Sequence, residues 1–197
     1  MKNKIVGIFV IMLLIIATVL PVTGTVENVN TKITNPQSAL ILQPPEAWNK
    51  TFGGITMDNG YSVEQTTDGG YIVSGATYSG GIPDVYLIKT DANGNKLWDT
   101  KPYSGANGYC VKQTADGGYI ITGSTFGIGD VLLIKTDTNG VEQWNATFGA
   151  LKADYGYSVQ QTTDGGYIIA GSSESNDGDV SRNREQSDYW IVKIIED

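Results

Sequence analysis

One short segment occurs three times in this chain at a fixed spacing of 48 residues, and this regularity constrains the fold more than any other feature. The segment reads Thr/Ala-Asp-Gly-Gly-Tyr-Ile and lies at residues 67–72, 115–120 and 163–168. A repeat with a period of about 20–50 residues is typical of architectures that stack one supersecondary unit or arrange it radially. The chain is therefore expected to be an array of three similar units.

Each unit contains short runs rich in aromatic and β-branched residues, separated by turn residues. This pattern predicts successive antiparallel strands, so the fold class is expected to be all-β. The third unit lacks a fourth run. The predicted strands are 61–66, 71–77, 85–90 and 96–103 in the first unit, 109–114, 119–125, 131–136 and 142–148 in the second, and 157–162, 167–172 and 189–195 in the third.

Two kinds of turn separate these strands. The Asp-Gly-Gly segments fall between the first and second strands, where a tight turn needs the positive φ that glycine adopts readily. The segments 91–94 and 137–140 play the same part between the third and fourth strands. We therefore expect both turns to be structural, and not sites for calcium or phosphate. The first glycines of the Asp-Gly-Gly segments are Gly69, Gly117 and Gly165.

A second motif, Asp-x-x-Gly-x-x-x-Trp, occupies residues 91–98 and 137–144. It resembles the repeat of quinoprotein-like β-propellers. Together with the Asp-Gly-Gly-Tyr and Leu-Ile-Lys-Thr-Asp segments, the unit also resembles the tandem repeats of exported archaeal and bacterial surface proteins, over residues 48–197. The resemblance implies four-stranded propeller-like blades in which tryptophans dock between neighbours, and it implies no quinone or other cofactor. The tryptophans expected in the core are Trp48, Trp98 and Trp144.

The first and last predicted strands of the array carry a further expectation. Residues 48–52 read as the fourth strand of a blade, whereas the last strand predicted, 189–195, is a third strand. Single-chain propellers have four to eight blades, so three blades are too few to close a ring. Exposed strand edges invite pairing, which favours a homodimer joined at its blade edges as a six-bladed ring. The alternatives are an open three-blade arc, whose edge Glu196 and Asp197 protect, and a fragment of a longer propeller protein.

The N-terminal region differs from the repeats. Lys2 and Lys4 precede an apolar run from Ile5 to Leu20, and this predicts a secretory signal peptide over residues 1–24. An uncleaved membrane anchor is the alternative, although the run is shorter than the ~20 residues that a spanning helix needs. Residues 25–45 are expected to be a polar linker and residues 46–197 the repeat domain. The protein is thus predicted to be secreted or on the cell surface, with membrane contact only through an uncleaved N-terminal segment.

Composition excludes several functions. The formal net charge of −8 disfavours nucleic acid as a partner, and the absence of histidine removes a Ser-His-Asp triad and most zinc sites. Cys110 replaces a serine of the other copies and is expected to be an inert thiol. Paired carboxylates could still hydrolyse glycosides, but acids that recur in every unit are more simply turn or strand-end residues. The recurring acids are Asp68, Asp116 and Asp164, and Asp84, Asp130 and Asp188.

The longest departure from the repeat is an insertion at residues 173–187, where the second unit has only residues 125–129. Long loops on rigid scaffolds often bind ligands. Weak candidates for calcium are Glu174, Asn176, Asp177 and Asp179, against a simpler interpretation as a solvated, flexible loop. Weak candidates for ligand contact are Arg182, Arg184, Tyr189 and Trp190, against strand packing for the aromatic pair. Asn49 and Asn145 lie in Asn-x-Thr sequons and are candidate glycosylation sites.

Together these features predict a non-catalytic, exported or cell-surface interaction module whose partner is a protein or a glycan. No cofactor is predicted, and calcium is the one ion considered. The first alternative is a carbohydrate-active module, either sugar-binding or a weak glycoside hydrolase. The second is a structural envelope component or a fragment of a longer propeller protein.

Overall fold

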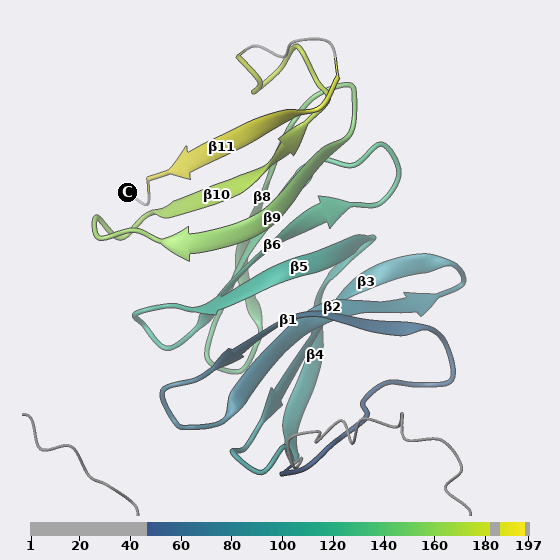
Figure 1. Ribbon diagram of the computed structural model, residues 1–197, viewed down its shortest axis with the longest axis vertical. Helices are drawn as coiled ribbons and strands as arrows, with labels where there is room; N and C mark the ends of the chain where they lie inside the picture. Colours follow the sequence, from purple (N-terminus) through teal and green to yellow (C-terminus); the bar gives the residue numbers. More distant parts are fainter. Residues whose placement is uncertain (1–46, 182–185, 196–197) are drawn as a thin grey trace, which may run out of the picture. The chain divides into compact units, whose positions relative to one another are not determined.

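The computed structural model describes residues 47–181 and 186–195, and these form eleven β-strands (Figure 1). The predicted signal peptide and linker lie outside the described residues. The strands are β1 (Asp58–Gln65), β2 (Tyr71–Ser79), β3 (Ile82–Thr90), β4 (Lys96–Ser104), β5 (Ala106–Gln113), β6 (Tyr119–Thr125), β7 (Val131–Thr136), β8 (Glu142–Phe148), β9 (Asp154–Gln161), β10 (Tyr167–Ser173) and β11 (Asp188–Ile194). The all-β prediction is confirmed.

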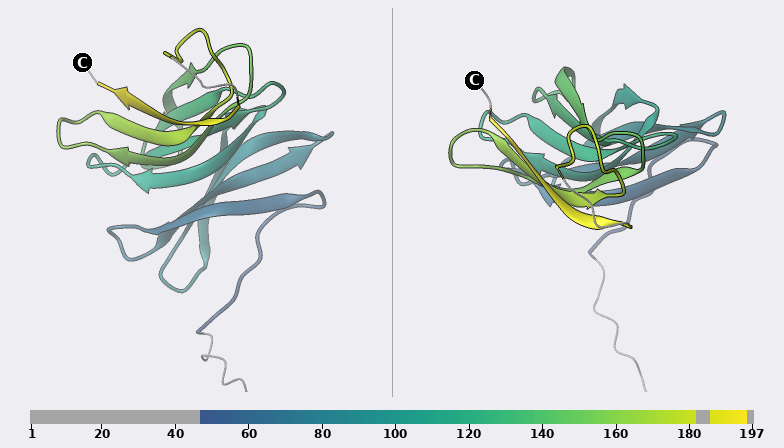
Figure 2. Two further views of the ribbon diagram at one scale, coloured as in Figure 1. Left: turned by 45° about the horizontal axis from the view of Figure 1, so that its top comes forward. Right: turned by 90° about the horizontal axis from the view of Figure 1, so that it is seen from above.

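The strands form three antiparallel sheets that follow the three sequence repeats. The first sheet has the order β1-β2-β3-β4 and the second β5-β6-β7-β8. The third has β9-β10-β11, so a fourth strand is missing from it among the described residues. Strand β5 lies beside both β1 and β9, which places the second sheet between the other two (Figures 1 and 2).

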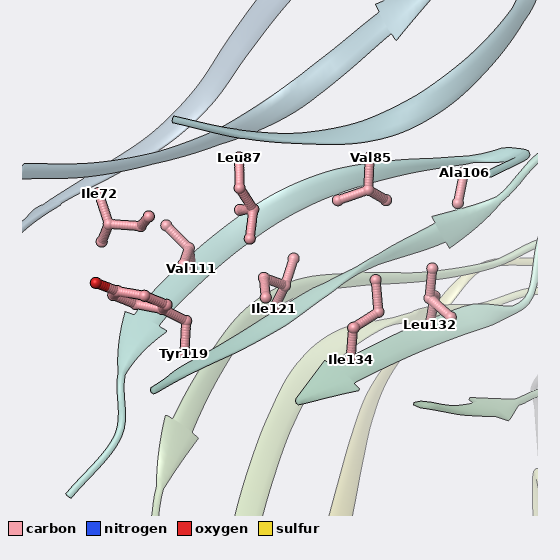
Figure 3. Close-up of a cluster of buried hydrophobic side chains, with 9 residues drawn as sticks. All are labelled: Ile72, Val85, Leu87, Ala106, Val111, Tyr119, Ile121, Leu132 and Ile134. Atoms are coloured by element: carbon pink, nitrogen blue, oxygen red, sulfur yellow. The ribbon is translucent and has the colours of Figure 1, made fainter. Parts of the chain in front are cut away.

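Two hydrophobic clusters hold the sheets together, one at each sheet-to-sheet contact. The first cluster, drawn in Figure 3, joins Ile72, Val85 and Leu87 of the first sheet to apolar residues of the second. The other cluster joins the second sheet to the third in the same manner. Each fully buried aliphatic or aromatic side chain contributes ~1.5–3 kcal/mol, so these two interfaces are the main source of stability.

We call the face of a sheet that packs on the next sheet along the chain its front face, and the opposite face its back face. Residues at equivalent register positions of the third sheet take the same names. The front face of each sheet carries Ile72, Val85 and Leu87, then Ile120, Val131 and Leu133, then Ile168, Tyr189 and Ile191. The back face carries Val63, Val73 and Ile88, then Val111, Ile121 and Ile134, then Val159, Ile169 and Val192. In both clusters the front face of one sheet packs on the back face of the next.

The first strand of each sheet begins earlier than predicted. Strand β1 starts at Asp58, three residues before the expected Tyr61, because Asn59 and Gly60 pair with Ala76 and Gly75. The backbones approach closely here, since a Cβ at Gly75 would clash with the carbonyl of Asn59. Glycine permits this close approach, but it is uncommon in strands, so the sequence pattern places the start of the strand too late.

The prediction of an opening strand at residues 48–52 is wrong. Residues 48–54 have no strand structure, and a strand exists only where a neighbour pairs with it. Trp48 nevertheless packs on the first sheet, with its ring 5.9 Å from that of Tyr71. Trp98 and Trp144 meet Tyr119 and Tyr167 at 5.9 and 5.8 Å, in the next sheet along the chain.

Candidate functional site

A row of tyrosines runs across the first strands of the three sheets. Tyr61, Tyr109 and Tyr157 lie at a break in the register of β1, β5 and β9, where each is skipped by the pairing with the second strand. An extra residue of this kind is a β-bulge, which redirects the side chain. The rings of Tyr61 and Tyr109 are 5.3 Å apart, and those of Tyr109 and Tyr157 are 6.0 Å apart. Tyr155 stacks on Tyr157 at 6.0 Å.

The two ends of this tyrosine row are open to solvent. Tyr61 is 44% exposed and Tyr157 is 54% exposed, whereas Tyr109 between them is half-buried. Burial is the largest cause that raises the pKa of Tyr61 and of Tyr109, and neighbouring tyrosines add to it. The phenols of Tyr61 and Tyr109 therefore stay neutral at physiological pH. The row offers aromatic faces for stacking and hydroxyl groups for hydrogen bonds.

Glutamine side chains fix the strands that carry the row. The backbone N–H of Thr67 donates to Oε1 of Gln113 at 2.9 Å, and that of Ala115 donates to Oε1 of Gln161 at 2.9 Å. Each bond joins the first turn of one sheet to the first strand of the next. The spacing of the tyrosines is thus set by contacts between sheets.

The sequence contained a signal for this row. The same residue type opens the first predicted strand of all three units, at positions 48 residues apart. The prediction treated these tyrosines only as strand formers, because the bulge that turns them outward follows from glycine approaches that sequence patterns do not display.

The Asp-Gly-Gly turns are anchored by a buried lysine in two of the three sheets. Asp68 pairs with Lys89 at 2.9 Å, Asp116 with Lys135 at 2.7 Å, and Asp164 with Lys193 at 3.0 Å. Each lysine also donates to a backbone carbonyl of its own strand, and each aspartate accepts bonds from a threonine two residues earlier and the glycine two residues later. Those glycine N–H donors are Gly70, Gly118 and Gly166.

These contacts lower the pKa values of the turn aspartates. For Asp68 the hydroxyl of Thr66 is the largest cause, followed by Lys89. For Asp116, burial raises the pKa, but Lys135 and Thr114 outweigh it and bring the value to about 2. For Asp164, Thr162 and Lys193 likewise lower it to about 2. A carboxylate this acidic, with its oxygens engaged, is poorly suited to general acid or base catalysis.

The other recurring acids do not share one environment. Asp84 accepts a bond from the Ser104 hydroxyl at 2.5 Å and pairs with Lys101 at 3.8 Å. The pKa of Asp130 is raised, first by burial and then by the nearby carboxylates of Asp154 and Asp179. Asp84 and Asp130 therefore occupy equivalent strand ends but have different partners.

The described part of the insertion is largely exposed, as expected of a solvated loop, and it is also bonded to β9 and to the connection between β8 and β9. Ser175 is fully buried, and its hydroxyl contacts Asp154 at 2.8 Å and the carbonyl of Lys152 at 3.2 Å. The backbone N–H of Gly149 donates to Asp179 at 3.3 Å, and Val180 is buried. The insertion thus covers the connection between β8 and β9.

The calcium candidates do not gather at one point. All four side chains are exposed, and Asp179 accepts a bond from the backbone N–H of Gly149. Within residues 47–181 and 186–195, no three acidic or cysteine side chains are grouped so that they could hold a metal ion. Calcium binding stays a prediction.

The remaining candidates fall into separate places. Arg182 and Arg184 lie outside the described residues. Tyr189 is fully exposed on the front face, while Trp190 packs against the second cluster, so the pair cannot form one stacking site. Cys110 is buried in that cluster.

The sequons and the structural residues lie at the outer strands and turns. Asn49 and Asn145 are both exposed, and the amide of Asn145 donates to Glu142 at 2.6 Å. Gly69, Gly117 and Gly165 have φ values of +83°, +83° and +88°. Trp98 and Trp144 are partly buried against the clusters, and Trp48 remains more exposed.

Neither the models of known protein families nor the curated proteins show a match to this sequence. Of the residues that the structure describes, none belongs to a helix with the length and apolar character to cross a bilayer.

Proposed function

We propose that this chain is a non-catalytic interaction module that acts outside the cell or at its surface, and that its three sheets are successive blades of the propeller type. The observation that carries the proposal is the tyrosine row, because large aromatic side chains left exposed in the first and third repeats, with a half-buried one between them, mark a binding surface. The turn aspartates support the non-catalytic part, since their oxygens are engaged with lysine, threonine and backbone N–H groups.

A carbohydrate ligand is the second candidate, and the same row favours it. Neutral phenol rings present flat apolar faces next to hydroxyl groups, which matches the alternation of C–H and O–H groups on a sugar. A polar hollow lined by Glu64, Lys112, Gln113, Gln160 and Gln161 lies along the same first strands and supplies hydrogen-bonding groups. A peptide or protein partner would use the rings as apolar contacts instead.

The binding test uses a tyrosine at the exposed end of the row. The full chain is applied to an oligosaccharide array and, separately, to a displayed peptide library. Tyr157→Ala is expected to lower binding by about 10-fold or more, as for an exposed aromatic contact worth ~1.4 kcal/mol. Ile128→Ala, at an exposed apolar residue between β6 and β7, is the matched control.

The outcomes separate the candidates. Glycan binding that Tyr157→Ala weakens and Ile128→Ala does not would support the sugar ligand. Peptide binding with the same response would support a protein partner. Binding that both variants leave unchanged would contradict the role of the tyrosine row, and turnover of any glycan would contradict the non-catalytic assignment.

A further inference from the structure

The front face of the third sheet and the back face of the first sheet are the two outer faces of the array. They correspond to the two surfaces that pack together at each sheet-to-sheet contact within the molecule. The front-face residues Ile72, Val85 and Leu87 are fully buried against the second sheet, and Ile120, Val131 and Leu133 are fully buried against the third. In the third sheet the same positions hold Ile168, Tyr189 and Ile191, which are 36%, 100% and 67% exposed. Within residues 47–181 and 186–195, no sheet packs on this front face.

The back face of the first sheet is the matching surface. Val111 and Val159 are buried by the preceding sheet, whereas Val63, at the same register position, is 63% exposed. Neighbouring back-face residues Val73 and Ile88 are more covered, so the apolar character of this face is retained. Among the described residues, therefore, no sheet packs on the front face of the third sheet or on the back face of the first, where only residues of the segment 48–52 lie.

A glycine shows that the back face of the first sheet has room for a partner. At Gly108 the space for a Cβ is taken by Val85 of the preceding sheet at 3.0 Å, and at Gly156 it is likewise taken by Val131 at 3.0 Å. At the equivalent Gly60, the nearest atom of the described residues to a Cβ belongs to Val73 of the same sheet, at 3.7 Å.

This vacancy matches a larger side chain on the front face of the third sheet. A hollow of about 50 Å³ lies at Gly60, lined also by Phe52, Val73, Tyr86 and Ile88. The residue that takes the place of Val85 and Val131 in the third sheet is Tyr189. The exposed ring of Tyr189 is thus larger than the valine side chains at the equivalent positions, and the hollow at Gly60 lies at the position that would face it.

Trp48 lies on the first sheet in the way that Trp98 lies on the second. A Cβ at Gly140 would meet the ring of Trp98, which comes from the fourth strand of the preceding sheet, and a Cβ at Gly94 would meet the ring of Trp48. Residues 48–52 therefore lie where the fourth strand of a preceding sheet would lie. The third sheet, which has no fourth strand among the described residues, would find one there.

We propose that a second copy of this chain docks head to tail, the front face of its third sheet covering the back face of the first sheet. Residues 48–52 of one copy then lie beside β11 of the other. The contact is heterologous, so copies form either a closed ring or an open filament. Each copy adds three sheets, and rings of four to eight blades are the ones that close, which selects two copies and six sheets. The inference goes beyond the binding function and does not depend on it.

The experiment measures molar mass in solution by light scattering, using the full chain recovered from an exporting host, with the chain mass fixed by mass spectrometry. Wild-type protein is expected at twice the chain mass. Ile191→Asp places a charge in the interface, and Gly60→Val fills the hollow. Each variant alone is expected to weaken association by on the order of 100-fold, because a buried unpaired charge or a steric clash costs several kcal/mol.

The two variants act on opposite faces, so their joint effect distinguishes head-to-tail docking from other arrangements. Ile128→Asp, at a residue 66% exposed and away from both faces, is the control and should remain a dimer. A wild-type monomer at 100 µM would overturn the proposal. A dimer that responds to Ile191→Asp but not to a folded Gly60→Val would indicate a symmetric contact between third sheets and would also overturn it, as would a series of growing multiples.

Discussion

The second and third sheets have nearly the same sequence pattern but different surroundings. In the second sheet, six of the seven residues of β6, Tyr119–Ser124, are buried, because a sheet covers each face. In β10 of the third sheet, buried Tyr167 and Ile169 alternate with exposed Ile168 and Ala170. The number of neighbouring sheets, and not the local sequence, therefore decides whether a front-face residue is core or surface.

The turn ion pairs follow the same rule. The Lys135 side chain is 3% exposed beside Asp116, whereas Lys193 is 37% exposed beside Asp164. A covered lysine depends on its carboxylate, since little water can replace that partner.

Removing the carboxylate should be far more costly in the second sheet. Asp116→Ala leaves the buried ammonium of Lys135 without its ion pair, although Thr136 O and Gln143 Oε1 still accept from it, and is expected to lower the free energy of unfolding by ~2–3 kcal/mol. Asp164→Ala should cost clearly less, because Lys193 can be hydrated. Urea denaturation of both variants measures the difference. Both lose the same turn hydrogen bonds, so equal losses would show that lysine burial is not the cause.

Truncating the same residue type on the two front faces should also separate the sheets. Ile120→Ala creates a cavity in the second cluster and is expected to cost ~2–5 kcal/mol. Ile168→Ala, at the equivalent position, should cost less than 1 kcal/mol in protein dilute enough to be monomeric. Thermal unfolding checks this pair. A similar loss in both would mean that the front face of the third sheet is covered within a single chain.

Acid should reduce the difference in stability between the Asp116 and Asp164 variants, because both carboxylates have pKa values of about 2 and become protonated together. A carboxyl whose pKa is lowered on folding stabilises the fold above its unfolded pKa, near 3.9. That contribution is lost as the pH falls from about 4 through about 2. Carboxyl resonances followed by NMR should show both midpoints near 2, and Thr162→Ala should raise that of Asp164. A midpoint near 4 for either would contradict its engagement.

The sequence patterns predicted most of the sheets and their turns. The bounds of β6, β7 and β8 agree with the prediction, since β-branched runs flanked by glycine turns leave little freedom there. The strand residues before Tyr61, Tyr109 and Tyr157 were not predicted, because they include glycines, which are atypical of strands. The β-bulges at these tyrosines were not predicted for the same reason.

Other features depend on contacts far apart in the chain. Lys89 and Lys135 look like surface residues in sequence, and their burial requires both the turn carboxylate and a covering sheet. Residues 48–52 have the pattern of a strand, but a strand also needs a neighbouring edge. The polar composition of the insertion predicts a solvated loop, and most of its described residues are exposed, but the buried bond from Ser175 to Asp154 of β9 depends on a contact that sequence patterns do not display.

Cross-linking across the two outer faces tests the central claim most directly. In the first cluster, Ile72 lies beside Val111 (Figure 3), and the equivalent residues on the unoccupied faces are Ile168 and Val63. Chains carrying Val63→Cys and Ile168→Cys, each with Cys110→Ser as in the other repeats, are mixed and treated with a short bis-maleimide. The account predicts a cross-linked dimer that contains one chain of each kind. Failure to form it, with both chains folded and both thiols reactive, would contradict the account.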